Sequence, residues 1–255
     1  LFTGPGRKWL ADQPLPADER LAVNRYLAEH DRLANDLAEL DKALAAEALE
    51  DERVHRLMTI AGVDAQVAIG VLAAIGDISW FTAPQKLVAY LGLDPTVRQS
   101  GDRPAQHGRI SRQGPGQARG LLVKRAWAAA STPGPLRAFF QRVQAKRGQQ
   151  IAAVATARKM AVIMWHLLTR GEDYAWARPA LVEAKMRDLE LAAGAHSQRG
   201  GQRRGRGYAY NIKDVRRKER AFVEQAETAY KRFIANWRDQ PPNGGTGATH
   251  RERSS

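Results

Sequence analysis

A serine that is followed by glycine, Ser100-Gly101, lies within a polar segment rich in arginine. The segment, residues 94–116, is interrupted by Gly and Pro and has too few apolar residues to form a buried element. Loops of this length inside a compact domain are usually functional or disordered. A serine hydroxyl beside guanidinium groups could attack a phosphodiester, whereas composition alone favours the alternative of a solvated basic loop. The arginines of the segment are Arg98, Arg103, Arg109 and Arg112.

Ser100 has no evident activating group nearby. A serine hydroxyl is a poor nucleophile until a base or a metal ion activates it, and Asp102 is the nearest carboxylate but a poor choice of base. The chain has no Cys, which excludes disulfides, thiol nucleophiles and Cys-based zinc or iron–sulfur sites. Its six His residues lie at least twenty-five positions apart, so no local His pair can form a metal site. A metal site assembled from residues distant in the sequence stays open, and we expect this chain to bind no cofactor.

The positive charge of the chain is concentrated in its second half. The formal net charge is +13. Residues 1–56 have eight basic and twelve acidic side chains, and residues 57–97 have one and three. Residues 98–194 have seventeen basic and six acidic side chains, and residues 195–255 have fourteen and six. An excess of this size indicates a polyanionic partner, so a nucleic-acid-binding surface should lie after residue 97.

A long helix is predicted from about residue 17 to residue 48. Apolar residues recur in it with alternating spacings of three and four, which is the heptad pattern of a coiled coil. This pattern predicts a helical arm through which the chain forms homo-oligomers. The alternatives are a helix packed within its own domain and an antiparallel hairpin. The heptad positions are Val23, Tyr26, His30, Leu33, Leu37, Leu40 and Leu44.

Residues 57–76 have the form of a helix-hairpin-helix. Two apolar helices flank a turn at Gly62, and Gly76 ends the second helix. A turn that leads into a helix N-terminus exposes backbone N–H groups, which favour a phosphate. Asp64 stands where such hairpins usually have a second Gly; it could cap the second helix, but its charge repels an anion. Contact with the DNA backbone at Gly62 and plain helix packing both stay open.

Further helices are predicted over residues 117–131, 136–147 and 149–170. Before them, Thr82 is the predicted N-cap of a helix that has Pro84 in its first turn and ends at Gly92. Strands are hard to find, so we expect a mainly α fold. The residues expected in the core around this point are Trp80, Phe81, Leu87, Tyr90 and Leu91. The basic residues near the apolar faces of the later helices are Arg119, Lys124, Arg125, Arg158 and Lys159.

The C-terminal region has a different composition. Residues 197–207 form a low-complexity Arg/Gly segment, of the kind that is disordered alone and binds single-stranded nucleic acid; a solubilising tail is an equal alternative. A helix is predicted after it, over residues 213–237. No membrane-spanning segment is expected, because the longest apolar stretch contains Arg158, Lys159 and His166. The expected organisation is an irregular linker (1–16), a helical coiled-coil arm (17–56), a compact helical domain (57–194) and a basic tail (195–255).

Three sequence blocks, taken in order, resemble one protein family. They are LMTIAGVDAQVAIGVLAAIGDISWF (57–81), KLVAYLGLDPTVRQSGDRPAQHGRISRQGPGQARGLLVKRA (86–126) and AAVATARKMAVIMWHLLTRGEDY (152–174). They are similar to the C-terminal half of the DEDD-type insertion-sequence transposases, relatives of the Piv DNA invertase that are also known as bridge-RNA-guided recombinases. The similarity spans about residues 7–175 and does not include the Arg/Gly segment.

The resemblance implies a covalent mechanism on DNA. In that family the Ser of the SG motif attacks a DNA phosphate and forms a phosphoserine link, and its match here is Ser100. The surrounding arginines, and the basic residues of the later helices, would line the nucleic-acid path. Four acidic residues of an N-terminal RuvC-like nuclease domain bind Mg²⁺, and two subunits assemble one site. The implied partners are DNA and a structured guide RNA, in the bacterial cytoplasm at the nucleoid.

The resemblance also implies that half of the enzyme is missing from this chain. The chain begins after the point where the RuvC-like domain should end, and no four-acid constellation is visible. We therefore expect a C-terminal fragment that binds nucleic acid but does not cut or rejoin it alone. One alternative is a non-catalytic helix-hairpin-helix module that binds DNA or RNA. Another is a structural coiled-coil protein whose charge serves only solubility.

Overall fold

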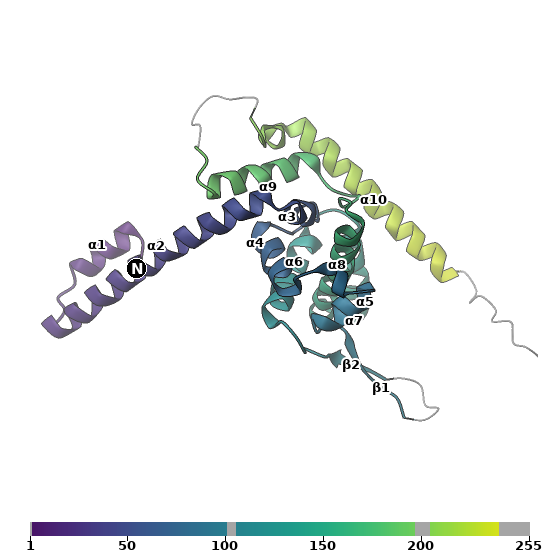
Figure 1. Ribbon diagram of the computed structural model, residues 1–255, viewed down its shortest axis with the longest axis horizontal. Coiled ribbons are helices and arrows are strands. Elements are labelled where there is room, and N and C mark those ends of the chain that lie inside the picture. The colour runs from purple at the N-terminus through teal and green to yellow at the C-terminus, as the bar shows by residue number, and fades with distance from the viewer. Residues whose placement is uncertain (1, 101–105, 197–204, 240–255) are drawn as a thin grey trace, which may run out of the picture.

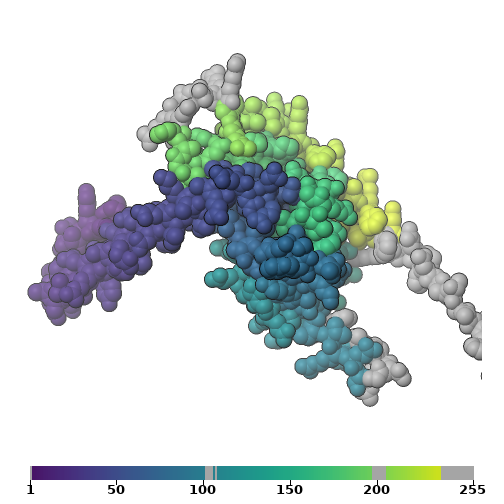
Figure 2. Space-filling model, viewed as in Figure 1, coloured from purple at the N-terminus to yellow at the C-terminus, as the bar shows by residue number. Residues whose placement is uncertain are grey.

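The computed structural model describes residues 2–100, 106–196 and 205–239, and in these ranges the protein is mainly α-helical, as predicted. A helical arm extends from a helical body, and a two-stranded ribbon leaves the body at a different place (Figure 1). Figure 2 shows that both features protrude well beyond the body surface. The Arg/Gly residues 197–204 lie outside the described residues.

The arm consists of two antiparallel helices, α1 (Gly4–Ala11) and α2 (Ala17–Glu50). The prediction of an irregular start was wrong for residues 4–11, because Pro5 lies in the first turn of α1, where a missing N–H removes no helical hydrogen bond. Arg7 of α1 donates to both carboxylate oxygens of Asp31 on α2. These hydrogen bonds lower the pKa of Asp31 to about 2. The N-terminal half of α2 is thus part of a hairpin.

The arm ends earlier than residue 56. At Asp51 the backbone becomes extended, and the Asp51 side chain accepts a hydrogen bond of 2.8 Å from the backbone N–H of Arg53. This cap begins a separate helix, α3 (Glu52–Met58). The change of direction places α3 inside the body, whereas most of α2 projects from it (Figure 1).

The predicted helical hairpin is present. After α3, the chain turns at Gly62 and enters α4 (Ala65–Ile75). Asp64 caps α4 by accepting from the backbone N–H of Val67 at 3.1 Å, which confirms its predicted capping role. Gly76, with a φ of 64°, ends the helix.

Two details of the next segment differ from the prediction. The 3₁₀ helix η1 (Ile78–Trp80) precedes α5 (Pro84–Tyr90), whose N-cap residue is Ala83 rather than Thr82. Phe81, Leu87 and Leu91 are buried as predicted, but Trp80 and Tyr90 are exposed. The Trp80 ring lies over Gly76 at the surface, and the Tyr90 hydroxyl reaches the carbonyl of Ala74, so neither ring enters the core.

The segment expected as a loop contains a β-ribbon. Strand β1 (Pro95–Arg98) pairs with β2 (Gln106–Ile110) in an antiparallel two-stranded sheet, with Val97 opposite His107 and Arg98 opposite Gln106. The strands were missed because no second layer of described residues packs on the ribbon, and its sequence lacks the alternation of apolar and polar residues that marks a half-buried strand. Residues 96–100 are exposed accordingly.

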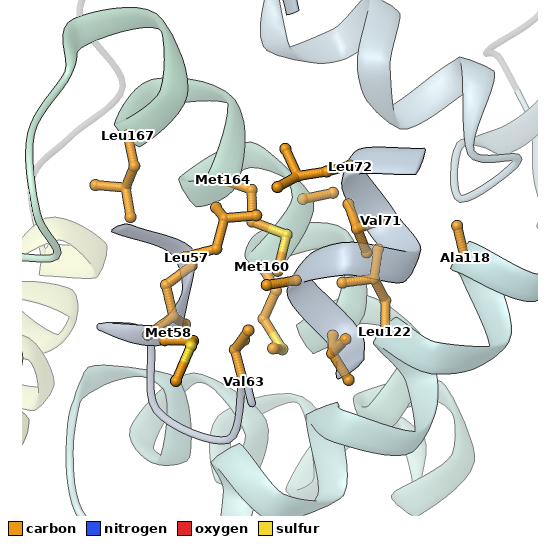
Figure 3. Close-up of a cluster of buried hydrophobic side chains, with 14 of the residues drawn as sticks. Leu57, Met58, Val63, Val71, Leu72, Ala118, Leu122, Met160, Met164 and Leu167 are labelled. Atoms are coloured by element: carbon orange, nitrogen blue, oxygen red, sulfur yellow. The ribbon is translucent and has the colours of Figure 1, made fainter. Parts of the chain in front are cut away.

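The body is completed by α6 (Gly116–Ser131), α7 (Pro135–Arg147) and α8 (Gln149–Arg170), whose ends agree with the prediction to within one residue. α8 crosses the core (Figure 3). By length and composition alone α8 could cross a membrane, but 44% of its apolar window is buried inside the protein. The core residues from α3, α4, α6, α8 and the α3–α4 turn include Leu57, Val63, Val71, Leu122, Met160 and Met164.

Two later helices cover the body. α9 (Pro179–Ala192) lies along α2, and after η2 (Tyr208–Asn211) the chain forms α10 (Lys213–Asp239), close to the predicted helix. Glu227 of α10 is buried; it accepts hydrogen bonds from the Gly134 N–H at 3.1 Å and from Arg137 at 2.9 Å. Burial raises the pKa of Glu227, but hydrogen bonds from Lys231, Arg137 and Gly134 outweigh it and hold the pKa below its usual value. α10 is therefore docked on α7 by a carboxylate.

Candidate nucleic-acid interface

Ser100 lies two residues beyond the end of β1, on the ribbon, and its side chain is exposed. The hydroxyl makes no hydrogen bond to another described residue, so nothing in the described chain prevents it from meeting a ligand. Its neighbours Gly101, Asp102 and Arg103 lie outside the described residues. The structure thus places Ser100 away from the apolar interior, as a nucleophile for a macromolecular substrate requires.

Three of the predicted arginines share the ribbon and its base. Arg98 ends β1, Arg109 belongs to β2, and Arg112 follows β2. All three are exposed, and within the described ranges none has a hydrogen bond or ion pair from its guanidinium group. Arg112 also has a positive φ of 56°, which is uncommon for a residue with a side chain. The exposed ribbon therefore presents positive charge that other described side chains do not neutralise.

The base of the ribbon is closed by a hydrogen-bonded clamp that the sequence analysis missed. The Ser111 hydroxyl donates to Asp94 Oδ1 at 2.7 Å, and the Ser111 N–H donates to the Asp94 carbonyl at 2.9 Å. The next N–H, from Arg112, donates to the Gly92 carbonyl at 3.2 Å. Asp94 and Ser111 belong to the sequences GLDP and GRISRQG. Their spacing of seventeen residues carries no local signal.

The segments that enter and leave the ribbon approach each other so closely at its base that only Gly fits at two positions. A Cβ on Gly92 would lie 2.1 Å from the Gln113 carbonyl oxygen, and one on Gly114 would lie 1.9 Å from the Tyr90 carbonyl oxygen. Both glycines also have positive φ. Arg119 of α6 completes the junction by donating to the Leu91 carbonyl at 3.2 Å. The predicted nucleic-acid-binding residue Arg119 thus has a structural contact at the base of the ribbon.

The hairpin turn at Gly62 is occupied by other parts of the protein. A Cβ on Gly62 would lie 2.9 Å from the backbone nitrogen of Ala129, so the turn packs directly on α6. Arg125 of α6 forms an ion pair with Asp64. These contacts favour helix packing over phosphate binding at the turn. A nucleic-acid contact of Gly62 or Arg125 stays a prediction.

Lys185 of α9 fills the other side of the same turn. Its Nζ donates to the carbonyls of Met58 and Val63, both at 2.7 Å. Burial lowers the pKa of Lys185 to about 8, and the charge of Asp64 acts in the opposite direction. The bonded carbonyls belong to the end of α3 and the turn, where backbone acceptors have no helical partner. Sequence gave no sign of this role, because the lysine is more than 120 residues from its partners.

Lys124, Arg158 and Lys159 extend the basic surface over α6 and α8. Lys124 and Lys159 are exposed and Arg158 is half-buried, and none of the three has a side-chain hydrogen bond or ion pair to another described residue. Residues 103–171 contain thirteen basic and no acidic residues, so their counter-charges must come from other segments or from a ligand. Among the described residues, no group of three or more His, Asp or Glu side chains could hold a metal ion.

Residues 54–141 match the Transposase IS116/IS110/IS902 family. This transposase-family segment runs from α3 into α7 and contains the hairpin, the clamp and the described part of the ribbon. α8 lies outside the matched segment although it crosses the core of the same body.

Curated relatives of the chain are also transposases by name. A probable family 20 transposase of Pseudomonas aeruginosa is 30% identical over 165 residues, which are 63% of this chain and 48% of the relative. The transposase for insertion sequence element IS1111A of Coxiella burnetii is 33% identical over 142 residues, 54% of this chain and 39% of the relative. The transposase for IS1328 of Yersinia enterocolitica is 26% identical over 163 residues, 58% of this chain and 46% of the relative. The matches thus span half or less of the length of these relatives.

Proposed function

We propose that this chain is the DNA-binding, serine-bearing half of a transposase and that Ser100 is its nucleophile. The observation that carries the proposal is the position of Ser100: exposed, on a projecting ribbon, in a segment whose described arginines are free of protein partners. The family match supports the class of reaction, because it covers the segment that bears the ribbon.

The proposed step is a transfer of a phosphoryl linkage from DNA to protein. Ser100 Oγ forms a bond to the phosphorus while the bond from phosphorus to one DNA oxygen breaks, and the hydroxyl proton ends on the departing DNA oxygen. Positive side chains near the ribbon offset the charge that develops on the non-bridging oxygens. One ester is exchanged for another, so the reverse step can rejoin DNA without ATP. By resemblance, Mg²⁺ held by the nuclease half would supply activation of the hydroxyl.

The same resemblance supplies two further proposals about partners. A structured guide RNA would select the DNA target, so that this chain needs cations for the backbone and few side chains that read bases. The place of action would be the bacterial cytoplasm, at the nucleoid. The runner-up function, a non-catalytic helix-hairpin-helix module, receives less support, because the turn on which it depends is engaged by α6 and Lys185.

The proposal is tested by comparing the chain alone with a complete transposase that also contains a RuvC-like domain. With Mg²⁺ and a cognate DNA junction, we expect the chain alone to shift labelled DNA in a binding gel without cutting it. The complete enzyme should form a covalent protein–DNA adduct that survives denaturation. Robust strand transfer by the chain alone would contradict the division of labour proposed here.

The arm offers a surface for the proposed homo-oligomer. α1 covers the side of α2 that contains Val23 and His30; Phe2, just before α1, stacks on His30 with ring centroids 4.5 Å apart. A strip of the predicted heptad positions stays uncovered, with exposed fractions between 45% and 76%. A second copy of the chain is the proposed occupant. The strip consists of Tyr26, Leu33, Leu37, Leu40 and Leu44.

We predict that Leu37→Asp weakens self-association, measured by sedimentation velocity, without unfolding the exposed arm. Residues 17–50 contain nine acidic and four basic side chains, so two arms repel each other, and association should strengthen when salt rises from about 50 to 500 mM because like charges are screened. Asn35→Asp, which adds the same charge to another face of α2, is the matched control. A chain that is monomeric at every salt concentration would exclude the arm as an interface.

A further inference from the structure

We propose that Asp94 and Ser111 are positioning residues that fix the direction of the ribbon and thereby the location of Ser100. This inference rests on the proposed function, in which Ser100 is the nucleophile. It assigns a role to two residues of the transposase-family segment that were not among the candidate site residues. The clamp joins the segment that enters the ribbon to the segment that leaves it. It consists of one side-chain and one backbone hydrogen bond between the same two residues.

Because the ribbon is long, a small change of angle at its base produces a large displacement of Ser100. Ser100 is six residues beyond Asp94, and an extended chain advances about 3.3 Å per residue, so up to about 20 Å of chain separates the two. A rotation of about 3° at the base then moves the hydroxyl by about 1 Å. Misplacement by about 1 Å can lower a reaction rate about 100-fold. The clamp must therefore hold its angle tightly if Ser100 is to meet a phosphate.

The surroundings show why the clamp, rather than packing, carries this task. The strands expose both faces to solvent, and β1 has no buried residue. Within the described ribbon, the side-chain hydrogen bond above the clamp joins the Thr96 hydroxyl to the Arg109 carbonyl at 3.0 Å. The contacts that attach the ribbon to the body, through Gly92, Gly114 and Arg119, lie next to the clamp. Loss of the clamp should therefore loosen the ribbon without opening the core.

A rival interpretation makes Ser111 itself a nucleophile, with Asp94 as its base. A hydroxyl that donates to a carboxylate at 2.7 Å has the geometry of such a pair. Two observations favour positioning. Both residues are half-buried at the base of the ribbon, and the Ser111 backbone is bonded to the same aspartate. Positioning and catalysis predict different results for one set of variants.

The direct test measures the spread of ribbon positions. Because the chain has no native Cys, spin labels at Ser100→Cys and Lys124→Cys report one distance distribution by double electron–electron resonance. We expect Ser111→Ala to broaden this distribution and Ser111→Thr, which keeps the hydroxyl, to restore it. Ser131→Ala, which removes a hydroxyl from the end of α6, is the matched control and should leave it narrow. An equally narrow distribution in Ser111→Ala overturns the proposal.

The functional test uses the complete transposase. Ser111→Ala should slow adduct formation at saturating DNA about 100-fold, with DNA affinity and melting temperature nearly unchanged, and Ser111→Thr should recover most of the rate. Asp94→Asn, which keeps the shape and one accepting oxygen, should give a smaller loss and serves if Ser111→Ala does not fold. If Ser111→Ala abolishes the adduct while the ribbon stays ordered, Ser111 is catalytic and the positioning role is wrong. If Ser100→Ala still forms the adduct, the proposed function fails, whereas the distance measurement continues to decide whether the clamp orders the ribbon.

Discussion

In the complete transposase proposed above, with Ser100 as the proposed nucleophile, Ser100→Ala is expected to abolish the covalent protein–DNA adduct and to leave DNA affinity nearly unchanged. The substitution removes the only atom proposed to bond to phosphorus. It removes no charge, and it touches no buried contact, because the Ser100 side chain is exposed. Surface substitutions of this kind change stability by about 0.5 kcal/mol or less. Binding and folding should therefore survive while the chemistry is lost.

The adduct is measured by mixing enzyme, Mg²⁺ and end-labelled DNA and separating the products on a denaturing gel, where only covalent complexes retain label on protein. The same samples on a native gel report affinity. Ser131→Ala serves as the matched control, because it also deletes a surface hydroxyl but lies at the end of α6. Persistence of the adduct in Ser100→Ala at the parental rate would remove Ser100 from the mechanism.

The second large effect that we expect is a steep loss of DNA affinity with rising salt concentration, for this chain alone. Six predicted contact residues are free of described protein partners: Arg98, Arg109, Arg112, Lys124, Arg158 and Lys159. If each neutralises one phosphate of duplex DNA, the logarithm of affinity falls with the logarithm of salt with a slope of about −5, which is about a 10³-fold loss between 50 and 200 mM salt. Released counterions are the physical cause.

Fluorescence anisotropy with a labelled duplex measures this slope. Lys159→Ala should reduce its magnitude by about one, because one phosphate contact is lost. Arg137→Ala should change the slope little, since Arg137 is already paired with Glu227 and Gly134 shares the same carboxylate. A slope near zero would favour the structural coiled-coil alternative, in which the charge serves only solubility.

The helices of this protein follow from local signals in the sequence. Apolar periodicity predicted α2 and α8, helices were also predicted close to α6, α7 and α10, and Asp64 and Gly76 were recognised as the start and end of α4. Such features depend on residues within one or two turns of each other, so a single sequence contains the information. The exposed position of Ser100 also follows from its polar surroundings. Where local signals compete, as at Pro5, Asp51 and Thr82, the predicted boundaries were wrong.

Tertiary structure alone decided what holds the candidate site. The strands at residues 95–98 and 106–110 pair next to the clamp, where Asp94 and Ser111 join segments seventeen residues apart, and an exposed ribbon has no alternating pattern in the sequence. In the sequence, Lys185 and Glu227 have no feature that distinguishes them from surface charges. In the fold, α9 places Lys185 beside the Met58 carbonyl, and α10 places Glu227 beside the Gly134 N–H. Their roles depend on contacts across roughly ninety or more residues. Composition and periodicity indicate which residues of one segment are buried and which are exposed. They do not indicate which segments contact each other, because the packing of the whole chain determines those contacts.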